Sequence, residues 1–535
     1  MNSLRTWFVL LAVVLGFAGT GPRAQAQSEK PAGESTQATS ATASKAEVDE
    51  LRKELAAQRQ TIEQLKNLVE QLTEVKSRAP APATDGAAHL VNANLPQPAT
   101  VAEAEPEAEA EMPLEVDQKP AEKVGTAPVT AGWNGEHFYI KSADGQFQIQ
   151  PYGYVQTDYR SYTGDGAPAD TFTLRRGRFG FQGNYGDHYQ FGILIDAAAT
   201  AGATVRDIYL NAKYNNAFQI QAGQFKEPFA QEEVTGVTNI DFVERGLQVV
   251  LYPSAASAFR SPGAVIHGDI NGGAFQYWAG AFNGKGFSTN NSTSVPEAVG
   301  RVRFYPWRNH KDSALQGFAF GASIAYSQAR GLSNELTPSM AMPDAAYTWL
   351  PQFQANGNVW RYEGEFTYLK GPWGFRDEYL WATFDRTGVG TETLGGLGFA
   401  DLPTVRFKAW NSSATYLLTK ERRPENGTPR VKHPVFGPTT EAGGARGWGA
   451  WELAFRYSGI QGNEPGIFFN NVFTPQELPT FNRHTDQFSV GVNWYLNYWV
   501  RFQSNFSVDR LKDPSTIGVT PQNYFVFLQR LQYRF

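Results

Sequence analysis

The chain of 535 residues contains no cysteine, which excludes disulfide bonds, thiolate metal sites and cysteine catalysis. It also lacks any run of roughly 20 apolar residues, the length that a membrane-spanning helix needs. Any insertion into a membrane must therefore use strands. The formal net charge is only −5. A charge this small points to neither anionic nor cationic partners, and we expect no nucleic-acid partner.

Aromatic residues are abundant, with 37 Phe, 23 Tyr and 13 Trp, beside 52 Gly. The mean hydropathy is nevertheless −0.41. A soluble protein this polar would have to bury most of its aromatics in cores. A transmembrane β-barrel meets both conditions, because one face of each strand contacts lipid and the other contacts water.

The N-terminus has the three parts of a secretory signal peptide. Arg5 supplies a positive charge, an apolar run extends from Trp7 to Gly19, and Ala24-Gln25-Ala26 is a small-residue cleavage site. We therefore expect residues 1–26 to be a signal peptide. The run is too short for a spanning helix, and the cleavage site disfavours the alternative of an uncleaved membrane anchor.

Residues 45–78 carry a heptad repeat of apolar side chains, which predicts a coiled-coil helix. A single solvated amphipathic helix is the alternative. Residues 79–131 are rich in Pro, Ala and Glu, cannot build a core, and predict a disordered linker. The two seam positions hold Val48, Leu55, Ile62 and Val69 on one side and Leu51, Leu65 and Leu72 on the other.

From residue 132 onward the hydrophobic pattern has a period of two, which is typical of strands. In the segment 451–457 the odd positions are large and apolar, whereas the even positions hold Glu452, Ala454 and Arg456. Soluble β-sandwiches alternate as well. Export, the aromatic strand ends and a last strand that stops on Phe535 favour a membrane barrel. We predict an all-β, antiparallel transmembrane β-barrel of about 16 strands over residues 132–535.

The lengths of the connections predict which end of the barrel each one occupies. The short links at 185–188 and 496–497 are expected in the periplasm, together with both ends of the barrel and the coiled coil. The long links at 330–356, 386–403, 420–447 and 460–483 are expected outside the cell. A basic cluster in the third of these would meet lipopolysaccharide phosphates or simply aid solubility. Its members are Lys420, Arg422, Arg423, Arg430 and Lys432.

Several short motifs resemble those of the phosphate-selective porin O/P family. A G-x-F-K-x-P-F element begins at Gly223, and an F-x-E-R element begins at Phe242. Two further matches are the arginine-rich stretch from Leu174 to Gly180 and the stretch from Gly300 to Pro306. The resemblance covers about residues 145–535. It implies a sixteen-stranded, trimeric diffusion channel whose third loop, residues 226–262, folds into the lumen and narrows it.

Candidate selectivity residues follow from the strand register, because a guanidinium on the lipid face costs about 2–4 kcal/mol at the bilayer midplane. Arginines on the lumen face would replace part of an anion's hydration shell. The predicted pore-lining set is Arg176, Arg178, Arg301, Arg303, Arg361, Arg456 and Arg501. The predicted constriction-loop set is Lys226, Glu232, Glu233, Arg245 and Arg260.

An alternative for these arginines carries nearly equal weight. Acidic side chains share their face by the same register, so the arginines would pair with them instead of meeting a solute. The constriction loop is itself acidic, which departs from what a phosphate trap requires. The acidic residues on the lumen face are Glu363, Glu365, Glu452, Asp158 and Asp509.

No catalytic or metal-binding motif is recognisable, and the seven histidines are scattered, so we expect no enzymatic activity, no cofactor and no metal site. The predicted function is an outer-membrane porin for passive diffusion of small hydrophilic solutes, with phosphate-like anions as candidates. The alternative is a structural barrel that tethers the outer membrane to the cell wall through its coiled coil. Expected partners are outer-membrane lipid, lipopolysaccharide, the barrel assembly machinery and two further copies of the chain in a homotrimer.

Overall fold

The computed structural model describes residues 129–164, 167–198, 202–332, 353–391, 399–437, 445–464, 481–512 and 523–535. The predicted signal peptide, coiled coil and all but the end of the linker lie outside these residues. No helix in the described part of the chain has the length and apolar character needed to cross a membrane.

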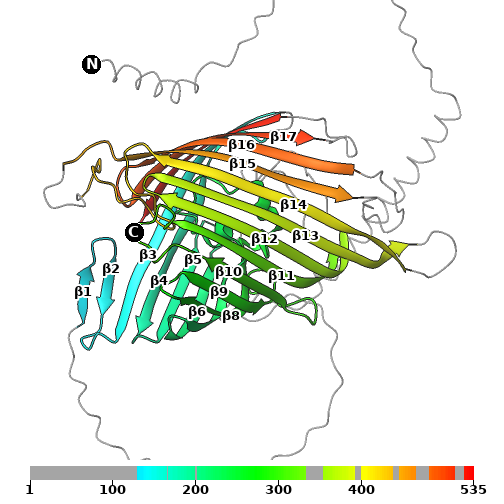
Figure 1. The fold of residues 1–535 in the computed structure, drawn as a ribbon, viewed down its shortest axis with the longest axis horizontal. Helices are drawn as coiled ribbons and strands as arrows, with labels where there is room; N and C mark the ends of the chain where they lie inside the picture. The colour runs from blue at the N-terminus through cyan, green and yellow to red at the C-terminus, as the bar shows by residue number, and fades with distance from the viewer. Residues whose placement is uncertain are drawn as a thin grey trace, which may run out of the picture. The chain divides into compact units, whose positions relative to one another are not determined.

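Sixteen antiparallel strands, β3 to β18, form a closed barrel, which confirms the predicted fold and strand number (Figure 1). A hairpin of two short strands, β1 and β2, precedes them and joins the sheet through β3. The strands are β1 Thr130–Trp133, β2 Phe138–Lys141, β3 Phe147–Thr163, β4 Thr171–Tyr185, β5 Tyr189–Asp196, β6 Thr204–Asn215, β7 Phe218–Lys226, β8 Arg260–Ile270, β9 Phe275–Phe282, β10 Glu297–Phe304, β11 Phe318–Leu332, β12 Gln354–Lys370, β13 Trp373–Thr391, β14 Phe399–Leu417, β15 Ala450–Glu464, β16 Phe481–Tyr495, β17 Val500–Lys512 and β18 Asn523–Arg534.

The last strand closes the barrel on the first, as the sequence predicts. Tyr154 to Thr163 of β3 pair with β18, and the backbone N–H of Phe535 donates to the carbonyl of Gly153 at 3.0 Å. Inside this seam, Arg530 forms two hydrogen bonds of 2.7 and 2.8 Å with Asp158. Closure leaves no strand edge unpaired in the bilayer, which is the condition for a stable membrane sheet.

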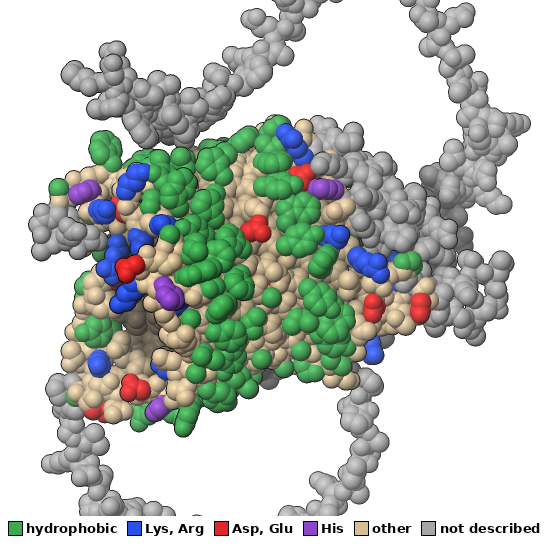
Figure 2. Space-filling view, viewed as in Figure 1, with side chains coloured by type: hydrophobic (Ala, Val, Ile, Leu, Met, Phe, Trp, Pro, Cys, Tyr) green, Lys and Arg blue, Asp and Glu red, His purple; other side chains and the backbone are tan. Residues whose placement is uncertain are grey.

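The two faces of each strand differ as a lipid-facing barrel requires. Phe455 is 54% exposed on the outside, whereas its neighbour Arg456 is 7% exposed on the inside. Figure 2 shows the outward hydrophobic side chains gathered in a broad band over the strands. Polar side chains therefore line the lumen on nearly every strand.

Successive connections alternate between the two ends of the barrel because every neighbouring strand pair is antiparallel. The terminal end, where β3 begins and β18 finishes, carries the short links 186–188, 216–217, 371–372 and 496–499. The loop end carries the links before β4, β6, β8, β10, β12, β14, β16 and β18. The long links at 330–356, 386–403 and 460–483 fall at the loop end, as predicted.

The long link between β14 and β15, residues 418–449, lies at the terminal end. The sequence-based grouping of 420–447 with the other long, external links is therefore wrong, because this link lies at the same end as the short links (Figure 1). That grouping rested on the length of the link alone. The end of the barrel at which a link lies is instead fixed by the number of strands that precede it. The described part, residues 418–437, turns partly inward: Arg423 is 2% exposed and Val431 packs with Leu417, Ala450 and Tyr495. We call it the inturned segment.

The sidedness of this segment is open to direct measurement, because a chain without cysteine accepts single reporter thiols. Asn426→Cys places an exposed thiol in the inturned segment, and Ser292→Cys places one between β9 and β10 at the loop end. With the terminal end in the periplasm, a bulky impermeant maleimide added to intact cells should label Ser292→Cys and leave Asn426→Cys unlabelled. Labelling of both thiols in permeabilised cells is the control. Labelling of Asn426→Cys in intact cells would contradict the topology.

Candidate functional site: the loop inside the barrel

The connection between β7 and β8, residues 227–259, folds into the lumen, and we call it the lumen loop. It contains one turn of helix, α3 Gln231–Val234, and two short 3-10 helices, η2 Leu247–Leu251 and η3 Ala255–Ser257. The strand that leads into it, β7, contains a backbone conformation that only glycine adopts without strain. Gly223 has a φ of +132°, and a Cβ there would lie 2.2 Å from the carbonyl oxygen of Ile208.

The backbone of the lumen loop is held by side chains of the barrel wall, because a buried peptide group must find a hydrogen-bond partner. Arg456 donates to the carbonyl of Glu244 at 2.8 Å, and Arg361 donates to that of Leu251 at 2.9 Å. From the opposite direction, the N–H of Leu247 donates to the hydroxyl of Ser458 at 3.0 Å. Polar side chains of the barrel wall thus hold the lumen loop in place.

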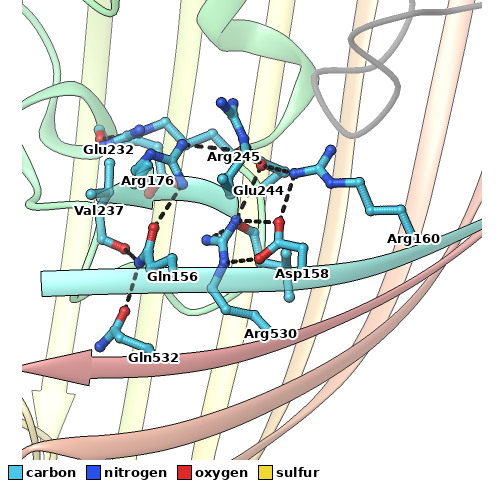
Figure 3. Close-up of polar contacts among 12 residues, drawn as sticks. Gln156, Asp158, Arg160, Arg176, Glu232, Val237, Glu244, Arg245, Arg530 and Gln532 are labelled. Atoms are coloured by element: carbon cyan, nitrogen blue, oxygen red, sulfur yellow. Dashed lines mark hydrogen bonds and ion pairs between the residues drawn. The ribbon is translucent and has the colours of Figure 1, made fainter. Parts of the chain in front are cut away.

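Glu244 is the first of two charged anchors in the lumen loop (Figure 3). Its carboxylate lies 2.6 Å from Arg160, 2.8 Å from Arg175, 3.2 Å from Arg530 and 3.6 Å from Arg176. Burial raises the pKa of this carboxyl group, but the guanidiniums of the four arginines outweigh it and hold the pKa well below its usual range. Because the pKa is depressed on folding, these ion pairs stabilise the loop above pH values near 4.5 and weaken only on further acidification.

Asp241 is the second anchor, and it joins the lumen loop to the inturned segment. It forms ion pairs with Arg376 of β13, at 2.8 Å, and with Arg423 of the inturned segment. Arg423 also lies 3.0 Å from Glu452 of β15. A second contact ties the inturned segment to the wall, where Glu425 accepts hydrogen bonds from Arg303 and Tyr305. The lumen is thus narrowed by two segments, one from each end.

All seven predicted pore-lining arginines lie on the lumen side, and each has a partner. Four of them form ion pairs with wall carboxylates, and Arg456 and Arg501 donate to loop carbonyls. Arg176 donates to Gln156 at 2.9 Å and lies near Glu244. The remaining contacts are Arg178–Asp196 at 2.7 Å, Arg301–Glu365 at 2.8 Å, Arg303–Glu365 at 3.0 Å, Arg361–Glu297 at 3.4 Å, and Arg501 to the carbonyl of Ile240 at 3.2 Å. Their role in selectivity stays a prediction.

The five predicted loop residues lie at the base of the lumen loop or within it. Lys226 and Arg245 both donate to the carbonyl of Thr235, at 2.9 and 2.7 Å, which closes the turn after α3. Arg260 pairs with Asp207 of β6 at 2.7 Å. The N–H of Glu232 donates to Glu378 of β13 at 2.6 Å. The Glu233 carboxylate is buried with no hydrogen-bond partner among the described residues.

A cavity of about 310 Å³ remains between the lumen loop and the wall of β3 to β8, and Arg534 of β18 and the following Phe535 complete its lining. One side is formed by the loop residues from Val234 to Thr238. The opposite side carries tyrosines and four cationic groups with one acidic group between them. The charged lining residues are Arg178, Asp207, Lys226, Arg260 and Arg534.

Several residues of the site are absent from the sequence-based sets. Arg376 lies on a strand whose alternation is broken by an outward Asp377, so its inward direction is not evident. Asp207 follows a β-bulge between β5 and β6, which shifts the register by one residue. The contact between Arg423 and Asp241 joins residues 182 positions apart, which no local pattern predicts.

Comparison with known proteins places this barrel in a family. The family described as phosphate-selective porin O and P matches residues 149–535. No curated protein matches the chain.

Among solved structures, the chain is similar to the outer-membrane protein OmpT of Vibrio cholerae, with 13% identity, a TM-score of 0.45, and coverage of 73% of this chain and 98% of that one. It is also similar to the outer-membrane channel DcaP of Acinetobacter baumannii, with 13% identity, a TM-score of 0.46, and coverage of 74% and 99%. A third similar structure is an anion-selective porin from Comamonas acidovorans, with 12% identity, a TM-score of 0.43, and coverage of 73% and 100%.

The Asp241 anchor predicts the consequence of its removal. Asp241→Asn leaves Arg376 buried without its carboxylate and Arg423 with Glu452 alone, so the free energy of unfolding should fall by about 3–5 kcal/mol. Urea-induced unfolding in lipid vesicles measures this loss. Single-channel recordings should show a larger and noisier current, because the lumen loop and the inturned segment lose their common tie. The exposed Asp269→Asn is the matched control, and an equal cost for both variants would contradict the anchor.

Proposed function

We propose, from the premise that the chain belongs to the phosphate-selective porin O and P family, that this outer-membrane porin passes small anions between its lumen loop and the wall of β3 to β8. Solutes cross by passive diffusion down their gradient, and the chain acts as a channel and not as an enzyme. The terminal end of the barrel faces the periplasm, and the porin assembles as a homotrimer in outer-membrane lipid.

The charge of the 310 Å³ cavity is the observation that supports an anion preference. Arg260 is neutralised by Asp207, and Arg178 by Asp196. Lys226 and Arg534 instead bond to neutral oxygens: Lys226 to two carbonyls, and Arg534 to the carbonyl of Tyr498 at 3.0 Å and to the amide of Asn239. Among the described residues neither forms an ion pair, so the cavity keeps a net positive charge.

A low-dielectric cavity with two uncompensated cations lowers the energy of an entering anion more than water alone does. Guanidinium and ammonium groups also replace the hydrogen bonds that an oxyanion loses with its hydration shell. Phosphate-like oxyanions suit this lining because they accept several such hydrogen bonds at once.

The predicted arginine set acquires two roles in this proposal. Arg178 lines the cavity and contributes directly to the path. The other six arginines, Arg176, Arg301, Arg303, Arg361, Arg456 and Arg501, act as positioning residues. They hold the lumen loop or its supporting carboxylates and so set the width of the path without meeting the solute.

The contacts of the N-terminal hairpin, β1 and β2, with the rim of the barrel favour a tethering role. Tyr498 donates to the Glu136 carboxylate at 2.9 Å, and the indole N–H of Trp499 donates to the Glu136 carbonyl at 3.2 Å. Trp133 packs against Trp499 with ring centroids 6.0 Å apart. These contacts would transmit a pull from the preceding chain to the barrel rim, so a link to the cell wall is compatible with a working channel.

The cavity lining predicts the effect of neutralising Arg534. In a planar bilayer with a salt gradient, the wild-type reversal potential should show an anion preference. Arg534→Gln should move the reversal potential toward zero, because one of the two cations without an ion pair is lost. Arg534→Lys keeps the charge and should retain most of the anion preference.

Arg510→Gln is the matched control, since Arg510 is an exposed, outward-facing arginine of β17. A wild-type preference for cations, or an equal shift in Arg534→Gln and Arg510→Gln, would contradict the proposed path.

A further inference from the structure

Three buried carboxylates meet on the lumen face of β12 and β13, apart from the proposed anion path. They belong to Glu363, Glu365 and Glu378, and an oxygen of each lies within 4.8 Å of an oxygen of the others. Glu365 and Glu378 are direct partners across the two strands. Oxygens bonded to one cation at about 2.4 Å lie no more than about 4.8 Å apart, so the spacing of the three carboxylates meets this condition for a shared ion.

Two of the three carboxylates have partners of their own. Both oxygens of Glu365 accept from Arg301, at 2.8 and 2.9 Å, and one also lies 3.0 Å from Arg303. Glu378 accepts from three groups of the lumen loop: the N–H of Glu232 at 2.6 Å, the amide of Gln248 at 3.2 Å, and the hydroxyl of Tyr252.

Glu363 differs, because neither of its oxygens has a hydrogen-bond partner among the described residues. The side chain is only 4% exposed. The hydroxyl of Ser323 lies beside it, but its one proton is donated to the carbonyl of Phe229. The cluster therefore contains unused oxygens and too few positive partners.

An ionised carboxylate buried without a partner costs several kcal/mol, so such a group is either protonated or balanced by another positive charge. Arg301 and Arg303 are both directed at Glu365, and Arg303 is shared with Glu425 of the inturned segment. Among the described residues, neither arginine forms an ion pair with Glu363, so a bound cation can supply the missing positive charge.

We propose that Glu363, Glu365 and Glu378 bind a divalent, oxygen-preferring cation of the Ca²⁺ class. Carboxylate and amide oxygens are the ligands that such an ion prefers. The ion would tie β12 and β13 to the lumen loop, because Glu378 already holds the loop at Glu232, Gln248 and Tyr252. It would also turn the residual charge of this wall from negative to positive. Binding is independent of the proposed function, whereas an effect on anion preference rests on it.

Calorimetric titration of the purified, full-length porin with CaCl₂ in detergent at neutral pH, after chelator treatment, tests binding. We expect one high-affinity site per chain and at least a tenfold loss of affinity in Glu363→Gln. Asp509→Asn is the matched control: its lumen carboxylate, on β17, accepts from Gln487 at 2.7 Å, and its affinity should equal that of the wild type. Calcium held by residual lipopolysaccharide would persist in Glu363→Gln, so the difference between the isotherms is the readout.

Glu363→Gln should fold, because it removes an uncompensated charge, and heat-modifiable mobility on gels verifies the folded barrel. Glu363→Asp, which keeps the charge on a shorter side chain, is the second variant and should bind with intermediate affinity. Two results would overturn the cation site. One is that the wild-type porin binds no calcium. The other is that Glu363→Gln or Glu363→Asp binds calcium with the same affinity as the wild type. The calorimetric result decides the cation site alone, because the three glutamates lie apart from the anion path, whose own test is the reversal potential of the Arg534 variants.

Discussion

The ion pairs between the lumen loop and the barrel wall are the interaction on which the rest of the structure depends. A sixteen-stranded barrel alone encloses a wide aqueous channel, and the lumen loop narrows it together with the inturned segment. Glu244 and Asp241 fix that position by binding arginines from β3, β4, β13, β18 and the inturned segment. Because these charges are buried, each pair is costly to break, and the channel keeps one width.

This use of arginine explains why a lumen rich in guanidinium groups need not be uniformly basic. Most of the arginines meet a carboxylate or a loop carbonyl, so their charge supports the loop. Lys226 and Arg534, which bond to neutral oxygens, both line the cavity beside the lumen loop. Glu363 on the wall and Glu233 in the loop are buried carboxylates without a hydrogen-bond partner among the described residues. Structural pairing thus leaves cationic groups at the cavity and a separate carboxylate cluster on β12 and β13.

The sequence predicts the barrel well because membrane strands obey a strict alternation. The register of Arg301 and Arg303 against Val302 and Phe304, and the closing role of the last strand, follow from that rule alone. The inturned segment was misplaced because its length resembles that of an extracellular loop, whereas its end is fixed by counting strands. The partners of Asp241 and Glu244 are not predictable locally, since they come from residues distant along the chain.

The most direct test of the account is the position of a permeating anion in the channel. An experimental structure of the porin soaked in selenate, an oxyanion with strong anomalous scattering, locates it without ambiguity. The account predicts selenate in the cavity between the lumen loop and β3 to β8, within contact distance of Lys226 or Arg534. Selenate on the other side of the loop, bound to Arg301, Arg303 or Arg456, would contradict it.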